Sequence, residues 1–265
     1  PIENRYELNE RLANLFESAM ETLDKKLSYA RYQAIAYLKP EAANGLYDNA
    51  ELISRSLAGI RKNGLVKRLE SSFYAFQISL NNFRQANQNM IDMFNRDKVF
   101  IAPDLDINNL LEAGLSDEEI EEKLNAKAEE NPKNSVFKAE EFDPEYIELL
   151  QQDQEILEKL YKDWEGITDE DDSKFAKFNE LLKHELFKVE RNPEQKLVVF
   201  SESVDTVKYL ERRINRKDVL VISADNRSKL FKTIRENFDA NYKTKLNKYN
   251  IILTTDVLAE GVNLH

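Results

Sequence analysis

Cysteine is absent from the 265-residue sequence, and only two histidines occur, His184 and His265. The absence of cysteine excludes disulfides and thiolate metal sites, and two histidines do not favour a zinc site built from imidazoles. No apolar run approaches the roughly 18 to 20 residues that cross a bilayer. Because the first residues also lack the charged-then-apolar pattern of a signal peptide, we expect a cytoplasmic protein without membrane contact.

Glycine is scarce as well. The six glycines form no G-x-x-x-x-G-K-[ST] loop, which is the segment that cradles a triphosphate. No acidic motif of the Asp-Glu-x-His kind is present to hold magnesium. The sequence therefore predicts no complete site for ATP hydrolysis within this chain.

The composition favours a folded, helix-rich protein. Its 42% apolar and 10% aromatic residues exclude a wholly disordered chain, and 33% charged residues indicate a well solvated surface. The length suggests one or two domains, since a domain usually takes roughly 100 to 200 residues.

The net charge of −11 is concentrated in the middle of the chain. Residues 101–180 contain 25 acidic and 8 basic residues, whereas residues 1–100 and 181–265 each carry a small positive charge. Because screening limits the reach of a surface charge to about 8 to 10 Å, the flanks can accept a polyanion even though the middle excludes one.

Residues 1–97 have the pattern of a helical region. Apolar residues at spacings of three and four from Leu12 to Leu27 predict a helix that ends before Pro40. We expect a second helix over about 50–58 and one long helix over about 65–94. The basic residues at 61–68 would lie at the start of the long helix, which is the unfavourable end of the helix dipole for cations. Two explanations remain open: the cluster binds an external anion, or it is exposed to solvent alone.

Residues 98–190 have the pattern of an acidic helical insertion or linker. Ser116 and Glu119 form a capping-box pattern that begins a helix reaching to about residue 130. Asp143 and Pro144 predict the N-cap and first residue of a further helix, which runs towards Trp164.

The run 168–172 of this region, Thr-Asp-Glu-Asp-Asp, is interpreted as a loop or hinge before another helix that carries Phe175 and Leu182. Paired carboxylates are frequent, but no histidine or other ligand alternates with them. We therefore interpret them as solvated surface rather than as catalytic or metal-binding groups. His184 is interpreted as a helix-surface or packing residue.

Residues 191–265 change from helical period to alternating strands and helices. Short apolar runs predict strands at 196–200, 219–222 and 251–253, with helices between them. The run at 196–200 is typical of a parallel strand buried on both faces, and the helix after it is expected to point Val204 inward. The order β-α-β-α-β predicts the α/β class with a parallel sheet, because right-handed crossovers lay such strands parallel. Ser201, Ser223 and Thr254 would then lie at the carboxyl edge of the sheet, where ligands bind in open α/β folds.

Three segments resemble a known family. The segment KLVVFSESVDTVKYL at 196–210 resembles motif IV of superfamily 2 helicases and translocases, and IILTTDVLAEGVNL at 251–264 resembles their motif V. LVKRLESSFYAFQISL at 65–80 looks like a helix near the lobe junction of bacterial members related to Swi/Snf-type ATPases. The resemblance implies a partial second RecA-like lobe at 191–265, preceded by the helical region and the insertion.

The resemblance also implies roles for residues at the end of the last strand. Thr255 corresponds to the motif V threonine that holds a nucleic-acid phosphate, and Thr254 and Ser201 are adjacent candidates for the same contact. Asp256 would cap the following turn and orient Thr255. An account in terms of ordinary caps and turns is the alternative for these residue types.

The end of motif V is expected to approach the nucleotide. Gly261 allows close approach of the backbone, and the Asn263 amide can meet a ribose hydroxyl or a bridging water. Glu260 stands where the best-known RNA helicases have an arginine, which favours the DNA-translocase branch. These three residues are the expected contribution to an ATP cleft.

The resemblance implies an internal piece of a larger motor that is inactive alone. ATP and Mg²⁺ would serve the full-length parent, whose upstream RecA-like lobe would be a partner within the same chain, and the arginine-finger segment would follow His265. The other expected partner is DNA, bound through its backbone with weak sequence preference. One alternative is a protein interaction module that docks a protein partner through its acidic helices. Another is a flavodoxin-like nucleotide enzyme, which the lack of a Gly-rich turn after Phe200 disfavours.

Overall fold

The computed structural model describes residues 3–45, 47, 49–102, 106, 119, 123, 126–127, 131–239 and 241–255. They form two compact units. The first, here called the sheet unit, combines Pro1–Phe16, Lys67–Ile78 and Gly166–His265, and the second, the helical unit, combines Glu17–Val66 and Ser79–Glu165. The expected domain ranges 1–97, 98–190 and 191–265 stay a prediction.

The sheet unit contains a three-stranded parallel sheet. Its strands are β3 (Leu197–Phe200), β4 (Val219–Ile222) and β5 (Ile251–Thr254), in the spatial order β3-β5-β4. The connections are α9 (Val204–Arg213) and α10 (Arg227–Phe238). The expected α/β class with the order β-α-β-α-β is confirmed.

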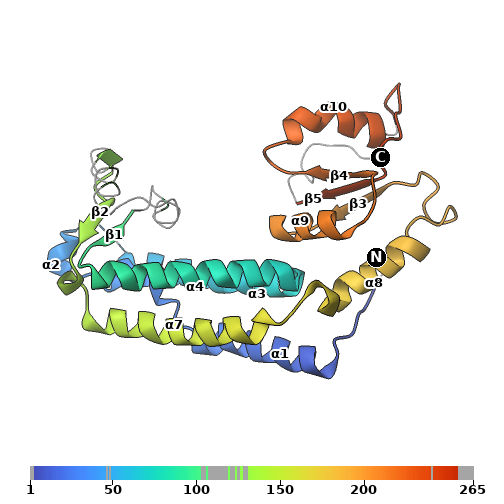
Figure 1. Cartoon of the computed structure of the whole chain (residues 1–265). Coiled ribbons are helices and arrows are strands. Elements are labelled where there is room, and N and C mark those ends of the chain that lie inside the picture. Colours follow the sequence, from blue (N-terminus) through green and yellow to red (C-terminus); the bar gives the residue numbers. More distant parts are fainter. Residues whose placement is uncertain are drawn as a thin grey trace. The chain divides into compact units, whose positions relative to one another are not determined.

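Helices cover both faces of this sheet (Figure 1). Ile251 and Leu253 pack in a cluster with α9 and with α8 (Ser173–His184), whereas Ile252 packs in a cluster with α10. The alternation follows from the period of two along a strand. One expectation is wrong here, since Val204, expected to point inward, is an exposed side chain. It is the first residue of α9 and precedes the turn that reaches the sheet.

Burial across the sheet differs from strand to strand. All four residues of β5 are buried, whereas β3 is only half-buried and Phe200 is 53% exposed. The expectation that β3 is buried on both faces is therefore wrong. In the described sheet β3 lies at the edge, so it has one neighbouring strand instead of two.

The helices before the sheet are divided differently from the expectation. Helix α3 (Ala50–Ser71) continues through Asn63 and Gly64, and α4 (Phe73–Asn95) follows after a break at Ser72. The interior glycine costs only about 1 kcal/mol, which a helix of 22 residues tolerates. The break arises because the Ser72 hydroxyl accepts the Ala75 N–H at 3.1 Å, as an N-cap does.

The basic residues at 61–68 consequently lie inside α3, not at its start. The dipole argument for an external anion is therefore wrong. Internal carboxylates neutralise two of the cations: Lys62 Nζ lies 2.6 Å from Asp24 Oδ1, and Lys67 Nζ lies 3.0 Å from Glu202 Oε2.

In the helical unit α4 packs antiparallel against α7 (Pro144–Glu165). The Asn87 side chain of α4 donates to the Leu150 carbonyl of α7 at 2.9 Å. The expected start of α7 is confirmed, because the Asp143 side chain accepts the Glu145 N–H at 3.0 Å. The described residues include no helix that is both long enough and apolar enough to cross a membrane.

The remaining elements are short. They are α1 (Glu10–Glu21), the π-helical turn η1 (Thr22–Lys26), the 3₁₀ helices η2 (Ala30–Ala36), η3 (Ala139–Glu141) and η4 (Asp169–Asp171), α2 (Pro40–Ala43), and the antiparallel strands β1 (Val99–Ile101) and β2 (Ser135–Phe137). The first apolar stripe therefore does not form one helix to Pro40. The chain turns at Tyr29, whose φ is 57°.

A buried carboxylate on α7 holds this turn. Asp153 is fully buried and accepts the Ser28 N–H at 2.8 Å, the Ser28 hydroxyl at 2.9 Å and the Ala30 N–H at 3.0 Å. Burial raises the pKa of Asp153, and the hydrogen bonds from Ser28 and Ala30 oppose that shift. The charged side chain therefore takes the place of the helical hydrogen bonds that the turn interrupts.

We expect Asp153→Asn to destabilise the helical unit by about 1 to 3 kcal/mol, because an amide cannot accept all three donors and leaves one unsatisfied. Trp164, the single tryptophan and also on α7, reports the unfolding by its fluorescence in urea. Asp163→Asn, an exposed change on the same helix, is the control. Equal urea midpoints for the two variants would show that the hydrogen bonds of Asp153 contribute nothing to the stability of the helical unit.

Polar contacts among Arg216, Asp218 and Asn250, here called the lock, join the starts of β4 and β5. The Asp218 carbonyl accepts the Asn250 N–H at 2.9 Å, and its carboxylate accepts the Asn250 side-chain amide at 2.9 Å and two donors of Arg216. The Arg216 hydrogen bond is the main cause that lowers the pKa of Asp218 to about 2.

This lock predicts a pH dependence. A lowered pKa means that the ionised carboxylate stabilises the fold, so its contribution is present above about pH 4 and is lost as the pH falls towards 2. We expect Asp218→Asn to lower the melting temperature at pH 5 and to have little effect at pH 2, measured by circular dichroism. Asp225→Asn, an exposed aspartate after β4, is the control. A gap of the same size at both pH values would contradict the lock.

Candidate functional site

The carboxyl edge of the sheet brings together the residues that follow its three strands. Phe200, Thr254 and Ile222 are in register, so the strands end level with one another. The Ser201 N–H donates to the Thr254 carbonyl at 3.0 Å, and the Ser223 N–H donates to the Asn226 side chain at 2.8 Å. Ser201, Ser223 and Thr254 therefore lie at the carboxyl edge of the sheet, as the order of the strands predicts.

Their side chains differ in accessibility. Thr254 is 0% exposed and donates its hydroxyl to the Thr255 carbonyl at 3.0 Å, and Thr255 is 8% exposed. Ser201 is half-buried. The predicted phosphate contacts of these three residues stay a prediction, with Ser201 the most accessible of them.

Four further candidates, Asp256, Glu260, Gly261 and Asn263, lie outside the described residues, as does Ser116 of the expected capping box. Among the described residues, His184 is exposed at the end of α8, and no group of three or more acidic or histidine side chains is placed to hold a metal ion.

Ser201 belongs to a group of hydroxyls that the sequence did not reveal. The Thr206 hydroxyl of α9 lies 2.8 Å from the Ser71 hydroxyl and 3.1 Å from the Ser72 hydroxyl, and Ser71 lies 3.4 Å from Ser201. We call Ser71, Ser72, Ser201 and Thr206 the hydroxyl cluster. The signal in the sequence was the Ser71-Ser72 pair, because serine favours caps over helix interiors.

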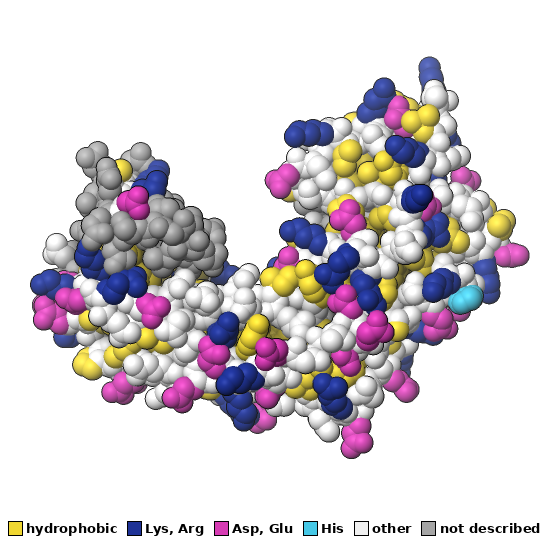
Figure 2. Space-filling model, viewed as in Figure 1, with side chains coloured by type: hydrophobic (Ala, Val, Ile, Leu, Met, Phe, Trp, Pro, Cys, Tyr) yellow, Lys and Arg dark blue, Asp and Glu magenta, His cyan; other side chains and the backbone are white. Residues whose placement is uncertain are grey.

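An open cavity of about 410 Å³ lies beside the hydroxyl cluster. Its walls are apolar, with Phe175, Phe178, Val199 and Leu210 among them, and its charged lining residues carry both signs. These charged residues are Lys67, Glu70, Asp172, Lys174 and Glu202. Basic and acidic side chains are also interspersed over the face drawn in Figure 2, so no single-signed field covers it.

Lys174 closes the end of α3 at this cavity. Its Nζ donates to the carbonyls of Glu70 and Ser71 at 2.9 and 3.1 Å, which are among the helix carbonyls left without an internal partner. Burial lowers the pKa of Lys174, and the carboxylates of Asp172 and Glu70 oppose that shift. The hydrogen bonds of Lys174 therefore go to the carbonyls at the end of α3 rather than to a ligand.

The acidic run 168–172, expected as a loop or hinge, contains the short 3₁₀ helix η4 between α7 and α8, and the solvated-surface interpretation is wrong for its last carboxylate, Asp172. Asp171 accepts the Thr168 N–H at 2.9 Å, and Asp172 is buried and accepts the Phe175 N–H at 2.8 Å as the N-cap of α8. The local capping bonds explain why this charged stretch forms the turn η4 and then a helix.

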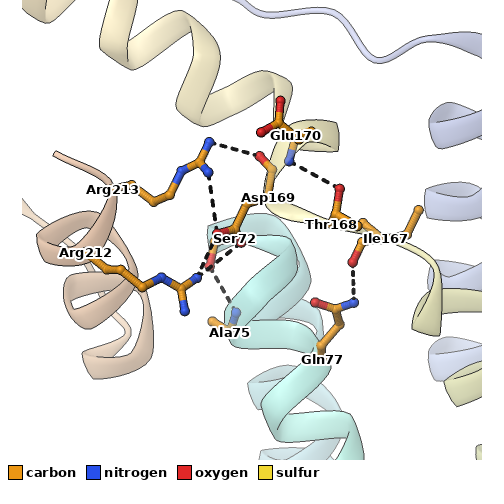
Figure 3. A network of polar contacts seen from close by, with 9 residues as sticks. All are labelled: Ser72, Ala75, Gln77, Ile167, Thr168, Asp169, Glu170, Arg212 and Arg213. Atoms are coloured by element: carbon orange, nitrogen blue, oxygen red, sulfur yellow. Dashed lines mark hydrogen bonds and ion pairs between the residues drawn. The ribbon is translucent and has the colours of Figure 1, made fainter. Parts of the chain in front are cut away.

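Two arginines at the end of α9 hold the same turn (Figure 3). Arg212 Nη2 lies 2.9 Å from Asp169 Oδ2, and Arg213 Nη1 lies 3.5 Å from the same oxygen. The Arg212 guanidinium also lies 4.6 Å from the centre of the Tyr74 ring of α4. Cation–π and ionic contacts thus join α4, η4 and α9 around the cavity.

Thr206→Val tests the hydroxyl cluster. The substitution keeps the shape of the side chain but removes the partner of two serine hydroxyls, so we expect a loss of about 1 to 3 kcal/mol in stability, measured by thermal unfolding. Thr244→Val, at an exposed threonine, is the matched control. A melting temperature unchanged from that of the control would show that the cluster is not coupled to folding.

Comparison with known proteins agrees with this architecture. Residues 173–265 match the family model described as "Helicase conserved C-terminal domain". Among curated proteins and solved structures, neither comparison gave a match. The matched range contains the whole parallel sheet together with α8, α9 and α10. Residues 173–265, about a third of the chain, are therefore similar to a helicase C-terminal domain, and this similarity supports a helicase-type component of a nucleic-acid motor.

Proposed function

We propose that the chain is part of an ATP-dependent DNA motor, either a helicase or a Swi/Snf-type translocase on duplex DNA, in which the carboxyl edge of the sheet grips the phosphate backbone. One observation carries the proposal: the helicase C-terminal match coincides with a parallel sheet whose three strands end level, with the hydroxyl residues Thr254, Ser201 and Ser223 at or directly after those ends.

Hydroxyls and backbone N–H groups at a strand end suit a phosphate oxygen, because they donate hydrogen bonds without distinguishing bases. Thr254 ends β5, Thr255 follows it directly, and Ser201 follows the neighbouring strand β3. A grip of this kind has weak sequence preference and weakens as salt rises. Glu260 stands where the best-known RNA helicases have an arginine, which supports the DNA-translocase branch of the superfamily over the RNA-helicase branch.

Triphosphate and Mg²⁺ binding are assigned to an upstream lobe of the parent protein. The sequence has no loop that cradles phosphates, so the contribution of this chain to the ATP cleft is limited to Glu260, Gly261 and Asn263. Hydrolysis in the cleft would close and open the lobes while the sheet edge holds the backbone, which couples DNA contact to the nucleotide state.

Thr255 gives the sharpest test. We expect Thr255→Val in the ATP-hydrolysing parent to abolish most of the stimulation of ATP turnover by duplex DNA, since valine keeps the shape of a largely buried side chain but lacks the hydroxyl. Thr255→Ser retains the hydroxyl and should retain most of the stimulation. Basal turnover without DNA is the internal control for folding. Stimulation that survives Thr255→Val undiminished would refute the proposed grip.

A further inference from the structure

The helical unit contains a large open cavity that the proposed motor function does not use. Its volume is about 720 Å³, and α3, α4, η2 and β1 supply most of its walls. Apolar side chains predominate among the lining residues, with Ile35, Ile53, Leu57, Met90 and Phe100 among them. We call this cavity and its lining residues the α3 groove.

Helix α3 presents uncovered apolar side chains at this groove. Ile53 and Leu57 line the groove, and Ile60, which is outside its lining, continues the same helix face at the i, i+4, i+7 spacing. Leu57 is 43% exposed and Ile60 is 62% exposed, although the opposite face of α3 buries Leu65 and Leu69. A run of large exposed aliphatic side chains on one helix face is typical of a surface that a partner covers.

Three cations and one carboxylate, Asp106, are among the residues that line the groove. Among the described residues, no carboxylate lies within ion-pair distance of Arg31, Arg61 or Lys133, whereas the nearby Arg55 pairs with Glu51. The guanidiniums of Arg31 and Arg61 lie 5.8 and 5.0 Å from the centre of the Tyr32 ring. The aromatic contacts hold the two arginines at the groove and leave their hydrogen-bond donors available.

The shape and charge together select an occupant. A phosphate backbone gains nothing from burying isoleucine, leucine and methionine, whereas an amphipathic helix places its apolar face in such a groove. Met90 and Met93, which are buried in the core of the helical unit, add apolar surface to the lining of the groove. From these observations we infer that the α3 groove binds an acidic amphipathic helix of a partner protein, with leucine-like side chains in the groove and carboxylates on Arg31, Arg61 and Lys133.

The probe for a binding test is a fluorescein-labelled synthetic helix with leucines at i, i+4 and i+7 and glutamates on the flanking positions. Fluorescence anisotropy is followed as the full chain is added. We expect saturable binding that weakens at least tenfold when a scrambled peptide of the same composition is used. Equal affinity for both peptides would overturn the inference.

Two sets of variants locate the binding. The double substitution Arg31→Glu and Arg61→Glu should weaken binding at least tenfold, and Leu57→Gln should weaken it several-fold. Arg55→Glu and Leu52→Gln change exposed residues of α3 outside the cavity lining and should stay within twofold of the wild type. Trp164 fluorescence verifies that each variant is folded. The inference fails if the two sets behave alike.

The same variants exclude other occupants. Self-association of the chain that the double arginine substitution abolishes would assign the groove to a second copy, and loss of duplex DNA binding in that variant would assign it to nucleic acid. Either result would overturn the inference. Because the groove belongs to the helical unit and Thr255 to the sheet unit, failure of this test leaves the proposed DNA grip unaffected.

Discussion

The pairing of β5 with both of its neighbours is the contact on which the sheet unit depends. Among the described residues, β3 and β4 do not pair with each other, and each pairs with β5, which follows both of them in the sequence. Burial of all four β5 residues therefore holds the sheet together across more than fifty residues of chain. The carboxyl edge exists only once this pairing has formed, so the position of Ser201 is a consequence of residues 251–254.

The site is not built from the helicase-like segment alone. The Ser72 hydroxyl that separates α3 from α4 meets Thr206 on α9, a contact between residues 134 positions apart. Lys174 in turn closes the end of α3 from α8. Residues 67–78 thus form one compact unit with the matched range 173–265. A break between two helices here serves as a wall of the cavity next to the sheet edge.

Local chemistry made part of this structure predictable. Buried parallel strands are recognisable in the sequence as short continuous apolar runs. Asp143 followed by Pro144 specifies the start of a helix, because the capping contact joins residues that are adjacent in the sequence. The break at Ser72 was missed because the apolar period continues unchanged on both sides of it. The ion pairs of Asp169 with Arg212 and Arg213 were not predicted, because only the fold brings the end of α9 to residue 169. Edge position, which exposes Phe200, is likewise a tertiary property.

Net charge is a poor guide to partners in this molecule, and the reason is the distribution of internal ion pairs. Lys67, which lines the cavity beside the carboxyl edge of the sheet, is neutralised by Glu202, and Arg212 at the other end of α9 is neutralised by Asp169. A polyanion there must rely on hydroxyl and backbone donors or displace those carboxylates. Among the residues that the structure describes, no carboxylate forms an ion pair with Arg31 or Arg61 of the helical unit, and the apolar lining of the α3 groove beside them does not suit a phosphate backbone. The −11 total therefore hides two different surfaces, and which cations are already paired decides what each can bind.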